Sequence, residues 1–232
     1  PDLFYLRAKL FYKDQGASTK DITSAEMAIK VLEGAVRQKP DVDRYRVLMG
    51  RLALRVQDKI IAQEQADSIL RVNAKSSEGY ALLGEIQMDS GNYEAAAKSF
   101  KTALNLTRNR SPLYTKLAES FKQLGQTGQA IEYYKKVTQE HPKDADAHLE
   151  LGKLYNQEGR FQGAVASFKR AISLNARLSE AFYFLGFIQK EMGDRDGALK
   201  SFETFLSLVP SGSESATIRD EVYFLKNGRS PN

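Results

Sequence analysis

LGEIQMDSGNYEAAAKSF, residues 83–100, is the stretch that decides the fold, because close copies of it recur along the chain. LGKLYNQEGRFQGAVASF occupies residues 151–168, and LGFIQKEMGDRDGALKSF occupies residues 185–202. These starts are 68 and 34 residues apart, and halfway across the longer interval residues 117–134 read LAESFKQLGQTGQAIEYY. A fixed period between about 20 and 50 residues indicates stacked supersecondary units rather than one irregular core.

Four kinds of residue keep this 34-residue step. A small residue recurs at Gly50, Gly84, Ala118, Gly152 and Gly186, and a second at Ala28, Ala62, Ala96, Ala130, Ala164 and Ala198. A large aromatic residue follows at Phe100, Tyr134, Phe168 and Phe202, and a glycine falls between the two halves of the unit at Gly91, Gly125, Gly159 and Gly193. The period therefore holds position by position.

Each unit is predicted to be a pair of helices. Apolar residues follow helical spacing on both sides of Gly91, and a glycine there can adopt the left-handed conformation that ends a helix. A small residue lets two helices cross closely, and the aromatic side chain of one helix can fill the space beside it. One such hairpin cannot bury its apolar stripe alone, so several must stack.

At these residues the chain resembles the tetratricopeptide repeat family of 34-residue helix-turn-helix units. The resemblance implies an all-α, right-handed solenoid of about six units, forming a single domain over residues 1–228 with a tail over 229–232. The units are expected at about 2–42, then 43–76, 77–110, 111–144, 145–178 and 179–212, and a capping helix at about 214–226.

Two units depart from the family pattern. In the first unit, a first helix is predicted from Tyr5, Ala8, Tyr12 and Gly16, and a second helix from residues 24–40. These two helices match the 34-residue pattern only if about seven residues, around 17–23, are inserted at the turn between them. In the second unit, Arg46 takes an aromatic position and Gln57 takes the place of the turn glycine. We expect both departures to affect helix ends and not the fold.

Composition and motifs indicate a folded protein without a catalytic centre. The chain has 232 residues, of which 42% are hydrophobic and 27% charged, and it has no cysteine, which excludes thiolate metal sites and thiol catalysis. Its two histidines, His141 and His148, read as a helix-end residue and a packing residue. No phosphate-binding loop or calcium loop is present, so we predict no enzyme activity, no cofactor and no metal.

The resemblance further implies a concave groove, lined by the first helix of each unit, that binds a protein or peptide. The predicted contact residues are Arg44, Arg51, Arg55, Glu85, Lys116, Lys122, Lys153, Asn156, Tyr183, Phe184, Phe187 and Lys190. The three aromatic residues among them either receive an apolar partner segment or pack against the neighbouring unit and the capping helix. If they receive a partner, Phe187→Ala or Arg51→Glu should weaken binding without changing the melting temperature.

Other ligands fit less well. Family members that bind chaperone tails hold the terminal carboxylate with matched Lys, Asn and Arg side chains, whereas equivalent positions here include Ala81, Glu85, Asp146 and Glu150, so that clamp is not expected. The net charge is +5, and residues 1–59 carry 12 Lys and Arg against 8 Asp and Glu. This asymmetry allows an acidic partner or an anionic surface. Nucleic acid is not the expected ligand, because the basic residues are not interleaved with exposed aromatic residues.

We therefore predict a non-catalytic binding scaffold, with two narrower alternatives. In size the chain is similar to bacterial type IV pilus assembly lipoproteins, and it also resembles helical output modules of bacterial signalling proteins. Because it opens at Pro1, we expect it to be trimmed from a longer protein. The sequence leaves the compartment open. It favours the cytoplasm, with the periplasm or an outer-membrane anchor as the alternative if an N-terminal signal was trimmed. No transmembrane segment is expected, and the oligomeric state is open.

Overall fold

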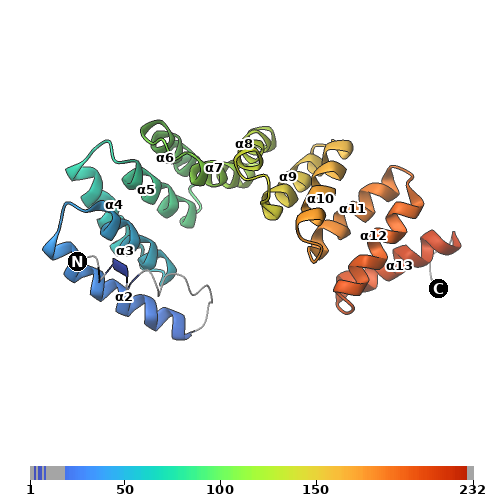
Figure 1. Cartoon of the computed structure of the whole chain (residues 1–232), viewed down its shortest axis with the longest axis horizontal. Coiled ribbons are helices and arrows are strands. Elements are labelled where there is room, and N and C mark those ends of the chain that lie inside the picture. The colour runs from blue at the N-terminus through green and yellow to red at the C-terminus, as the bar shows by residue number, and fades with distance from the viewer. Residues whose placement is uncertain (1–2, 4, 7, 9–18, 229–232) are drawn as a thin grey trace. The chain divides into compact units, whose positions relative to one another are not determined.

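The computed structural model describes residues 3, 5, 6, 8 and 19–228 (Figure 1), and within them all regular secondary structure is helical. The helices are α2 (Thr19–Gln38), α3 (Asp43–Arg55), α4 (Lys59–Val72), α5 (Ser77–Asp89), α6 (Tyr93–Leu106), α7 (Ser111–Gln123), α8 (Thr127–Glu140), α9 (Ala145–Gln157), α10 (Phe161–Leu174), α11 (Ser179–Glu191), α12 (Arg195–Leu208) and α13 (Ser213–Asn227). From α3 to α12, 13-residue first helices alternate with 14-residue second helices, and every start repeats after 34 residues.

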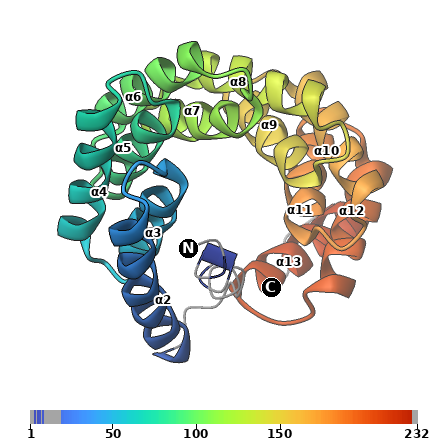
Figure 2. The same cartoon turned by 60° about the vertical axis from the view of Figure 1, so that its left-hand side comes forward.

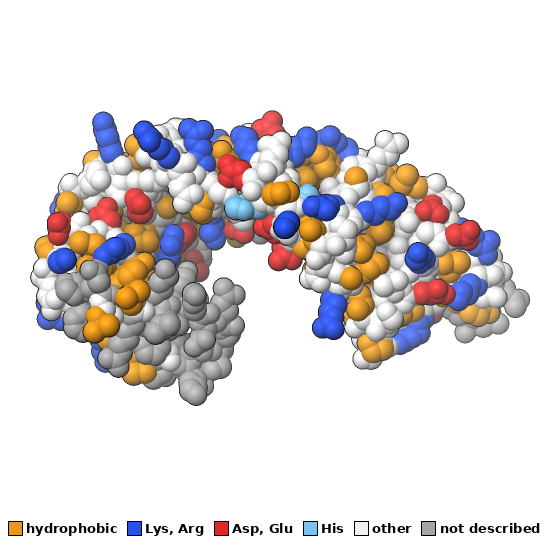
Figure 3. Space-filling model, in the orientation of Figure 1, with side chains coloured by type: hydrophobic (Ala, Val, Ile, Leu, Met, Phe, Trp, Pro, Cys, Tyr) orange, Lys and Arg blue, Asp and Glu red, His pale blue; other side chains and the backbone are white. Residues whose placement is uncertain are grey.

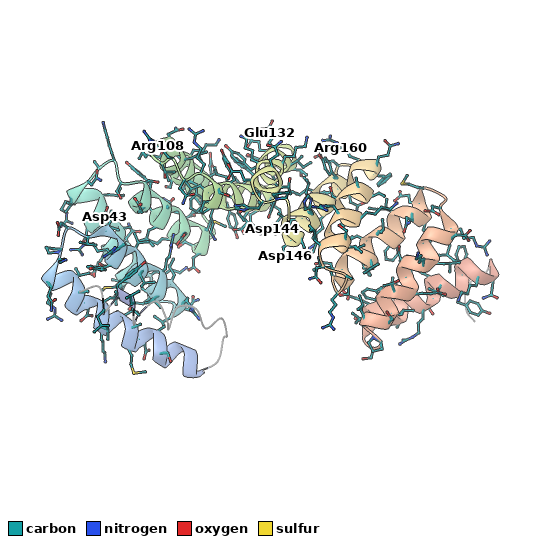
Figure 4. The ribbon with its side chains drawn as sticks, in the orientation of Figure 1. Asp43, Arg108, Glu132, Asp144, Asp146 and Arg160 are labelled. Carbon is teal, nitrogen blue, oxygen red and sulfur yellow. The ribbon has the colours of Figure 1, made fainter. Side chains whose placement is uncertain are left out.

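Short polar residues begin several of these helices. The side chains of Asp58, Ser76, Asp144 and Asp194 each accept a hydrogen bond from the backbone N–H three residues ahead, which satisfies a donor that the first helical turn leaves open. The Ser76 hydroxyl also donates, at 3.0 Å, to the carboxylate of Asp43. Asp43 lies at the start of α3 (Figure 4). Local sequence therefore stabilises the starts of these four helices.

The chain divides into two compact units, and each is described by itself. Unit 1 covers Pro1–Gly125 and contains α2 to α7; unit 2 covers Gln126–Asn232 and contains α8 to α13. In unit 2, Figure 2 shows the first helices α9 and α11, together with α13, forming one layer, while α8, α10 and α12 form the other. That residues 1–228 form one domain stays a prediction.

Glycines and aromatic rings interlock inside three of the helix pairs. A Cβ atom added to Gly84 would lie 2.6 Å from Phe100, one added to Gly152 would lie 2.7 Å from Phe168, and one added to Gly186 would lie 2.4 Å from Phe202. All three rings are fully buried. Each ring therefore occupies the space that the missing Cβ leaves open.

The second repeat fills the same space differently. Its second helix has Ala66 where the others have an aromatic ring, and a Cβ added to Gly50 would instead lie 2.7 Å from Leu82 of the following repeat. Leu82 is fully buried in a cluster with Tyr45 and Leu52. A neighbouring repeat thus supplies the missing volume.

The first repeat differs from its prediction at the turn. Helix α2 begins at Thr19, so the predicted inserted turn is wrong for residues 19–23, and residues 17–18 lie outside the described part. No glycine or proline stands between residues 19 and 33, so nothing in that sequence breaks the helix. Tyr5 and Ala8 are helical as expected, Ala8 is buried, and the Tyr5 ring lies 5.8 Å from that of Tyr45. Tyr12 and Gly16 lie outside the described residues.

The turns follow the expected pattern, with one strained exception. Gly91, Gly125, Gly159 and Gly193 have φ between +67° and +80°, and Gln57 takes the same left-handed conformation at φ +62°. A side chain with a Cβ pays a steric penalty there that glycine avoids. The departure at Gln57 therefore leaves the turn intact and adds strain.

The interlock predicts opposite effects for two glycine substitutions in unit 1. Gly84→Ala is expected to destabilise the protein by about 1–3 kcal/mol, because its Cβ would clash with the buried Phe100 ring. Gly34→Ala in α2 meets nothing within 4 Å and should stabilise it by about 0.5–1 kcal/mol. Urea unfolding followed by circular dichroism measures both, and an equal effect of the two changes would contradict the interlock.

The turn strain gives a second pair of predictions. Gln57→Gly should raise the stability by up to about 1 kcal/mol, since glycine removes the left-handed penalty but loses more entropy on folding. The reverse change, Gly91→Gln, should lower it by a similar amount. Thermal melting of both variants tests this, and a melting temperature for Gln57→Gly at or below that of the wild type would rule out strain at residue 57.

Candidate partner-binding surface

The twelve predicted contact residues all lie on first helices. Eleven are partly buried, and Arg44 is exposed. Six lie in unit 1 and six in unit 2. We call the accessible side chains of α3, α5 and α7 the first-helix face of unit 1, and those of α9, α11 and α13 the first-helix face of unit 2. The two faces carry different chemistry.

In unit 1 the central feature is an ion pair between equivalent positions of successive repeats. Arg51 on α3 donates two hydrogen bonds to Glu85 on α5, from Nε to Oε2 and from Nη2 to Oε1, both at 2.9 Å. The Glu85 side chain is only 17% exposed. A two-pronged arginine–carboxylate contact fixes both partners in orientation, so this pair links α3 to α5.

A hollow of about 470 Å³ opens beside this pair. Its lining combines charged, polar and apolar side chains: Arg51, Leu54, Glu85, Met88, Asp89, Tyr93, Lys116 and Gln123. Asp89 pairs with Lys59 at 2.8 Å, and Lys116 approaches Glu119 at 3.6 Å. Figure 3 likewise shows both acidic and basic side chains on the drawn face of unit 1. Charges in this hollow are therefore largely satisfied within the chain.

The basic run around α3 is engaged inside unit 1. The Arg44 guanidinium lies 5.4 Å from the ring centre of Tyr5 and 5.3 Å from that of Tyr45. Arg46 donates to the Pro40 carbonyl and to the Gln65 side chain, at 3.3 and 3.2 Å. Arg51 is likewise held by Glu85. The positive charge that these arginines offer to a partner is therefore smaller than the excess of Lys and Arg in residues 1–59 predicts.

In unit 2 the central feature is an aromatic patch, which we define as Tyr183, Phe184 and Phe187 of α11. Phe184 stacks on Phe168 of α10, with ring centres 5.8 Å apart, and Phe187 meets Phe202 of α12 edge-on at 5.0 Å. All three patch residues nevertheless remain partly exposed. Both interpretations of these rings therefore hold in part: they pack within unit 2 and also present an apolar surface.

This packing corrects one expectation. Removing the Phe187 ring would take away its contacts with Phe202 and Tyr183, so Phe187→Ala cannot leave the melting temperature unchanged. Arg51→Glu would break the pair with Glu85, with the same consequence. Tests of binding at these positions need substitutions that the repeat tolerates.

Charged residues flank the aromatic patch on both sides. The Lys153 ammonium lies 2.8 Å from Glu150 and 2.5 Å from Glu180. Burial by itself would lower the pKa of Lys153, but its hydrogen bonds to the two carboxylates outweigh burial and raise that pKa. On the other side, Lys190 pairs with Glu221 of α13 at 2.5 Å. The patch therefore lies between two lysines that carboxylates hold in place.

A second hollow, of about 230 Å³, adjoins the patch where α11 meets the start of α13. Its lining consists of Ser179, Glu180, Tyr183, Phe184, Phe205 and Glu214. Phe205 and Glu214 carry part of the site's chemistry and were absent from the predicted contact residues. The sequence did hold a signal for Glu214, since it stands 34 residues after Glu180, at the same position of the next first-type helix.

The remaining candidates add no second centre. Lys122 and Asn156 line neither of the two hollows. His148 Nε2 lies 3.4 Å from the Pro142 carbonyl. Burial lowers the pKa of this histidine, and it outweighs the hydrogen bond to Pro142, which raises the pKa. Among the residues that the structure describes, no three His, Cys, Asp or Glu side chains converge as metal ligands would.

Comparison with known proteins assigns the family. Two tetratricopeptide repeat models match residues 115–179 and 180–212, and an SHNi-TPR model matches residues 77–112. The chain belongs to the tetratricopeptide repeat family. No curated protein sequence matches this tetratricopeptide repeat chain. In the described part of it, no helix is both long and apolar enough to cross a membrane.

Solved structures share the fold at low sequence identity. PilF of Pseudomonas aeruginosa matches 95% of this chain and 98% of its own, with TM-score 0.75 and 17% identity. PilW, described as a type IV pilus biogenesis factor, matches 94% and 99%, with TM-score 0.75 and 18% identity. YrrB, described as having an unusual peptide-binding site, matches 81% and 97%, with TM-score 0.70 and 18% identity. The predicted all-α solenoid of tetratricopeptide repeats is thereby confirmed.

The Arg51–Glu85 pair can be tested by exchanging its charges. Arg51→Glu should lower stability by about 1–2 kcal/mol at low salt, because two carboxylates would then face each other. The double exchange Arg51→Glu with Glu85→Arg should recover most of that loss. Urea unfolding at low and high salt measures both variants, and a double exchange no more stable than the single change would mean that the pair does not hold α3 to α5.

Proposed function

We propose that this tetratricopeptide repeat chain is a non-catalytic scaffold that binds a segment of a partner protein on its first-helix faces, with the aromatic patch as the main contact. The observation that carries this proposal is a comparison between repeats. The position of Phe187 holds a charged residue in each of the four preceding repeats: Arg51, Glu85, Glu119 and Lys153. Repeat packing therefore does not require an aromatic residue there.

An aromatic side chain that packing does not require still has a cost. Leaving part of a large ring in contact with water forfeits hydrophobic free energy, about 25 cal/mol for each Å² of apolar surface. Partly buried aromatic residues on a rigid element are also the side chains that most often dominate binding energy in protein interfaces. Tyr183, Phe184 and Phe187 meet both conditions, because α11 holds them and their neighbours limit their motion.

The unit 1 face suits a different contribution. Its hollow offers amide, carboxylate and ammonium groups beside Leu54 and Met88, without one dominant sign of charge. Such a mixed surface adds orientation and specificity more than affinity. We assign it the secondary contact.

A second, narrower function is assembly of a bacterial envelope structure. The match to PilF and PilW extends over nearly the whole length of all three chains, so their lengths and folds agree. Deleting the gene in its source organism and imaging surface pili tests this role. Loss of pili that the wild-type gene restores would support it, and normal pili would exclude it while leaving the general scaffold function in place.

The aromatic patch can be removed with residues that the repeat already uses. Phe184→Glu with Phe187→Lys copies the pair Glu150 and Lys153, which occupies the same two positions in α9. We expect this variant to fold and to lose at least about tenfold in partner affinity, as removal of interface hot spots does. Binding is measured by capturing partners from source-cell extract and titrating the purified partner.

The matched control places the same charges elsewhere in unit 2. Ala166→Glu with Ser173→Lys changes two exposed positions of the second helix α10 and should bind like the wild type. If the patch variant keeps full affinity and the α10 variant loses it, the partner binds the second-helix layer and the proposal fails.

A further inference from the structure

The first-helix face of unit 2 is acidic, although the whole chain is basic. Its charged side chains are seven carboxylates and four cations. The carboxylates are Asp146, Glu150, Glu180, Glu191, Glu214, Asp220 and Glu221, and the cations are Lys153, Lys190, Arg219 and Lys226. The chain as a whole has a formal net charge of +5. Beside the aromatic patch, this face therefore carries a net negative charge, opposite to the net positive charge of the chain.

The lysines leave part of this negative charge unmatched. Lys153 is shared between Glu150 and Glu180, and Lys190 pairs with Glu221. Within the described part of the chain, neither Asp146 nor Glu214 forms an ion pair. Asp146 lies at the start of α9 (Figure 4), whereas Glu214 lines the aromatic-walled hollow. The unmatched carboxylate at the hollow is thus Glu214.

The size and walls of the hollow limit its occupant. Its volume of about 230 Å³ is below the range of about 300–1,000 Å³ that small-molecule sites span, so it suits one side chain rather than a separate ligand. Tyr183, Phe184 and Phe205 supply apolar walls, and Glu180 and Glu214 supply negative charge. An anion would meet repulsion there, and a purely apolar group would desolvate carboxylates without pairing them.

Unit 2 itself shows which group such surroundings hold. Lys153 contacts Glu180 and lies 5.9 Å from the ring centre of Phe184. Lys190 contacts Glu221 and lies 5.5 Å from the ring centre of Phe224. In both cases a cation is held by a carboxylate and an aromatic ring together. The hollow repeats this combination with Glu214 and Tyr183, without a lysine of its own for Glu214.

We infer that this hollow receives a lysine or arginine side chain of the partner, whose apolar neighbours contact the aromatic patch. This inference rests on the proposed function, since it names the chemistry of the segment that the patch binds. The cation contacts Glu214 and Glu180 while its methylene groups lie along the aromatic walls. The partner segment therefore carries a basic residue beside apolar ones.

The test selects random twelve-residue peptides, displayed on phage, on the wild-type chain. Enriched peptides should carry Lys or Arg next to apolar residues, and replacing that cationic residue with glutamine should weaken binding of the synthetic peptide. Glu214→Gln is expected to reduce its affinity about five- to tenfold, because it removes a charge-assisted contact. Affinity should also fall as salt rises, since this hollow is open to solvent.

A control variant separates this effect from general attraction of basic peptides. Glu132→Gln removes one exposed carboxylate from the second helix α8 of the same unit (Figure 4) and should leave the affinity unchanged. An equal loss in Glu132→Gln and Glu214→Gln would overturn the inference. Thermal melting of both variants confirms that each is folded.

Two further outcomes distinguish failure of this inference from failure of the proposed function on which it rests. Peptides without cationic residues that lose binding in Phe184→Glu with Phe187→Lys, but not in Glu214→Gln, would overturn the cation site and leave the aromatic patch as the docking surface. Selection of peptides that none of these variants affects would overturn both.

Discussion

The structure depends on one contact inside the repeat. An aromatic ring on one helix fills the space that a Cβ would take up on a glycine of the helix that crosses it. Phe100, Phe168 and Phe202 each occupy the space that Gly84, Gly152 and Gly186 leave open, and all three rings are fully buried. The contact fixes the distance and angle between the two helices of a repeat. Because three repeats share it and the helices of all five repeats from α3 to α12 keep the 34-residue step, side chains at equivalent positions of successive repeats take equivalent places. That regularity makes the differences between repeats informative.

The differences fall on the first-helix positions that the interlock does not use. In unit 1 these positions carry charges that satisfy one another, most clearly Arg51 and Glu85, so their contribution to the fold is visible. In unit 2 the equivalent position carries Phe187, whose ring is only partly buried. Under the proposed function, an aromatic residue at a position where sister repeats hold a charge serves to bind a partner. The carboxylates around it then indicate that the partner segment is basic.

From the sequence, the features that repeat every 34 residues could be predicted. The contacts between side chains of neighbouring helices could not. The 34-residue step located the helix pairs, and the turn glycines predicted the left-handed residues that the structure shows at Gly91 and its equivalents. The extension of α2 to Thr19 was missed, since an insertion carries no repeat to align it. Sequence also placed Phe187 on a face without showing that Phe202 packs against it. Glu214 was overlooked because α13 was interpreted only as a capping helix, although the 34-residue spacing from Glu180 was readable.

The most direct test of the account is site-specific photocrosslinking in the source cell. Phe184 is replaced by p-benzoylphenylalanine, whose ring preserves the aromatic character of the patch, and Ala166 on α10 is replaced in a matched strain as the exposed control. The account predicts that irradiation joins a partner protein to residue 184 and leaves residue 166 without an adduct. A partner joined at residue 166 and absent at residue 184 would contradict it, because the chain would then bind through its second-helix layer.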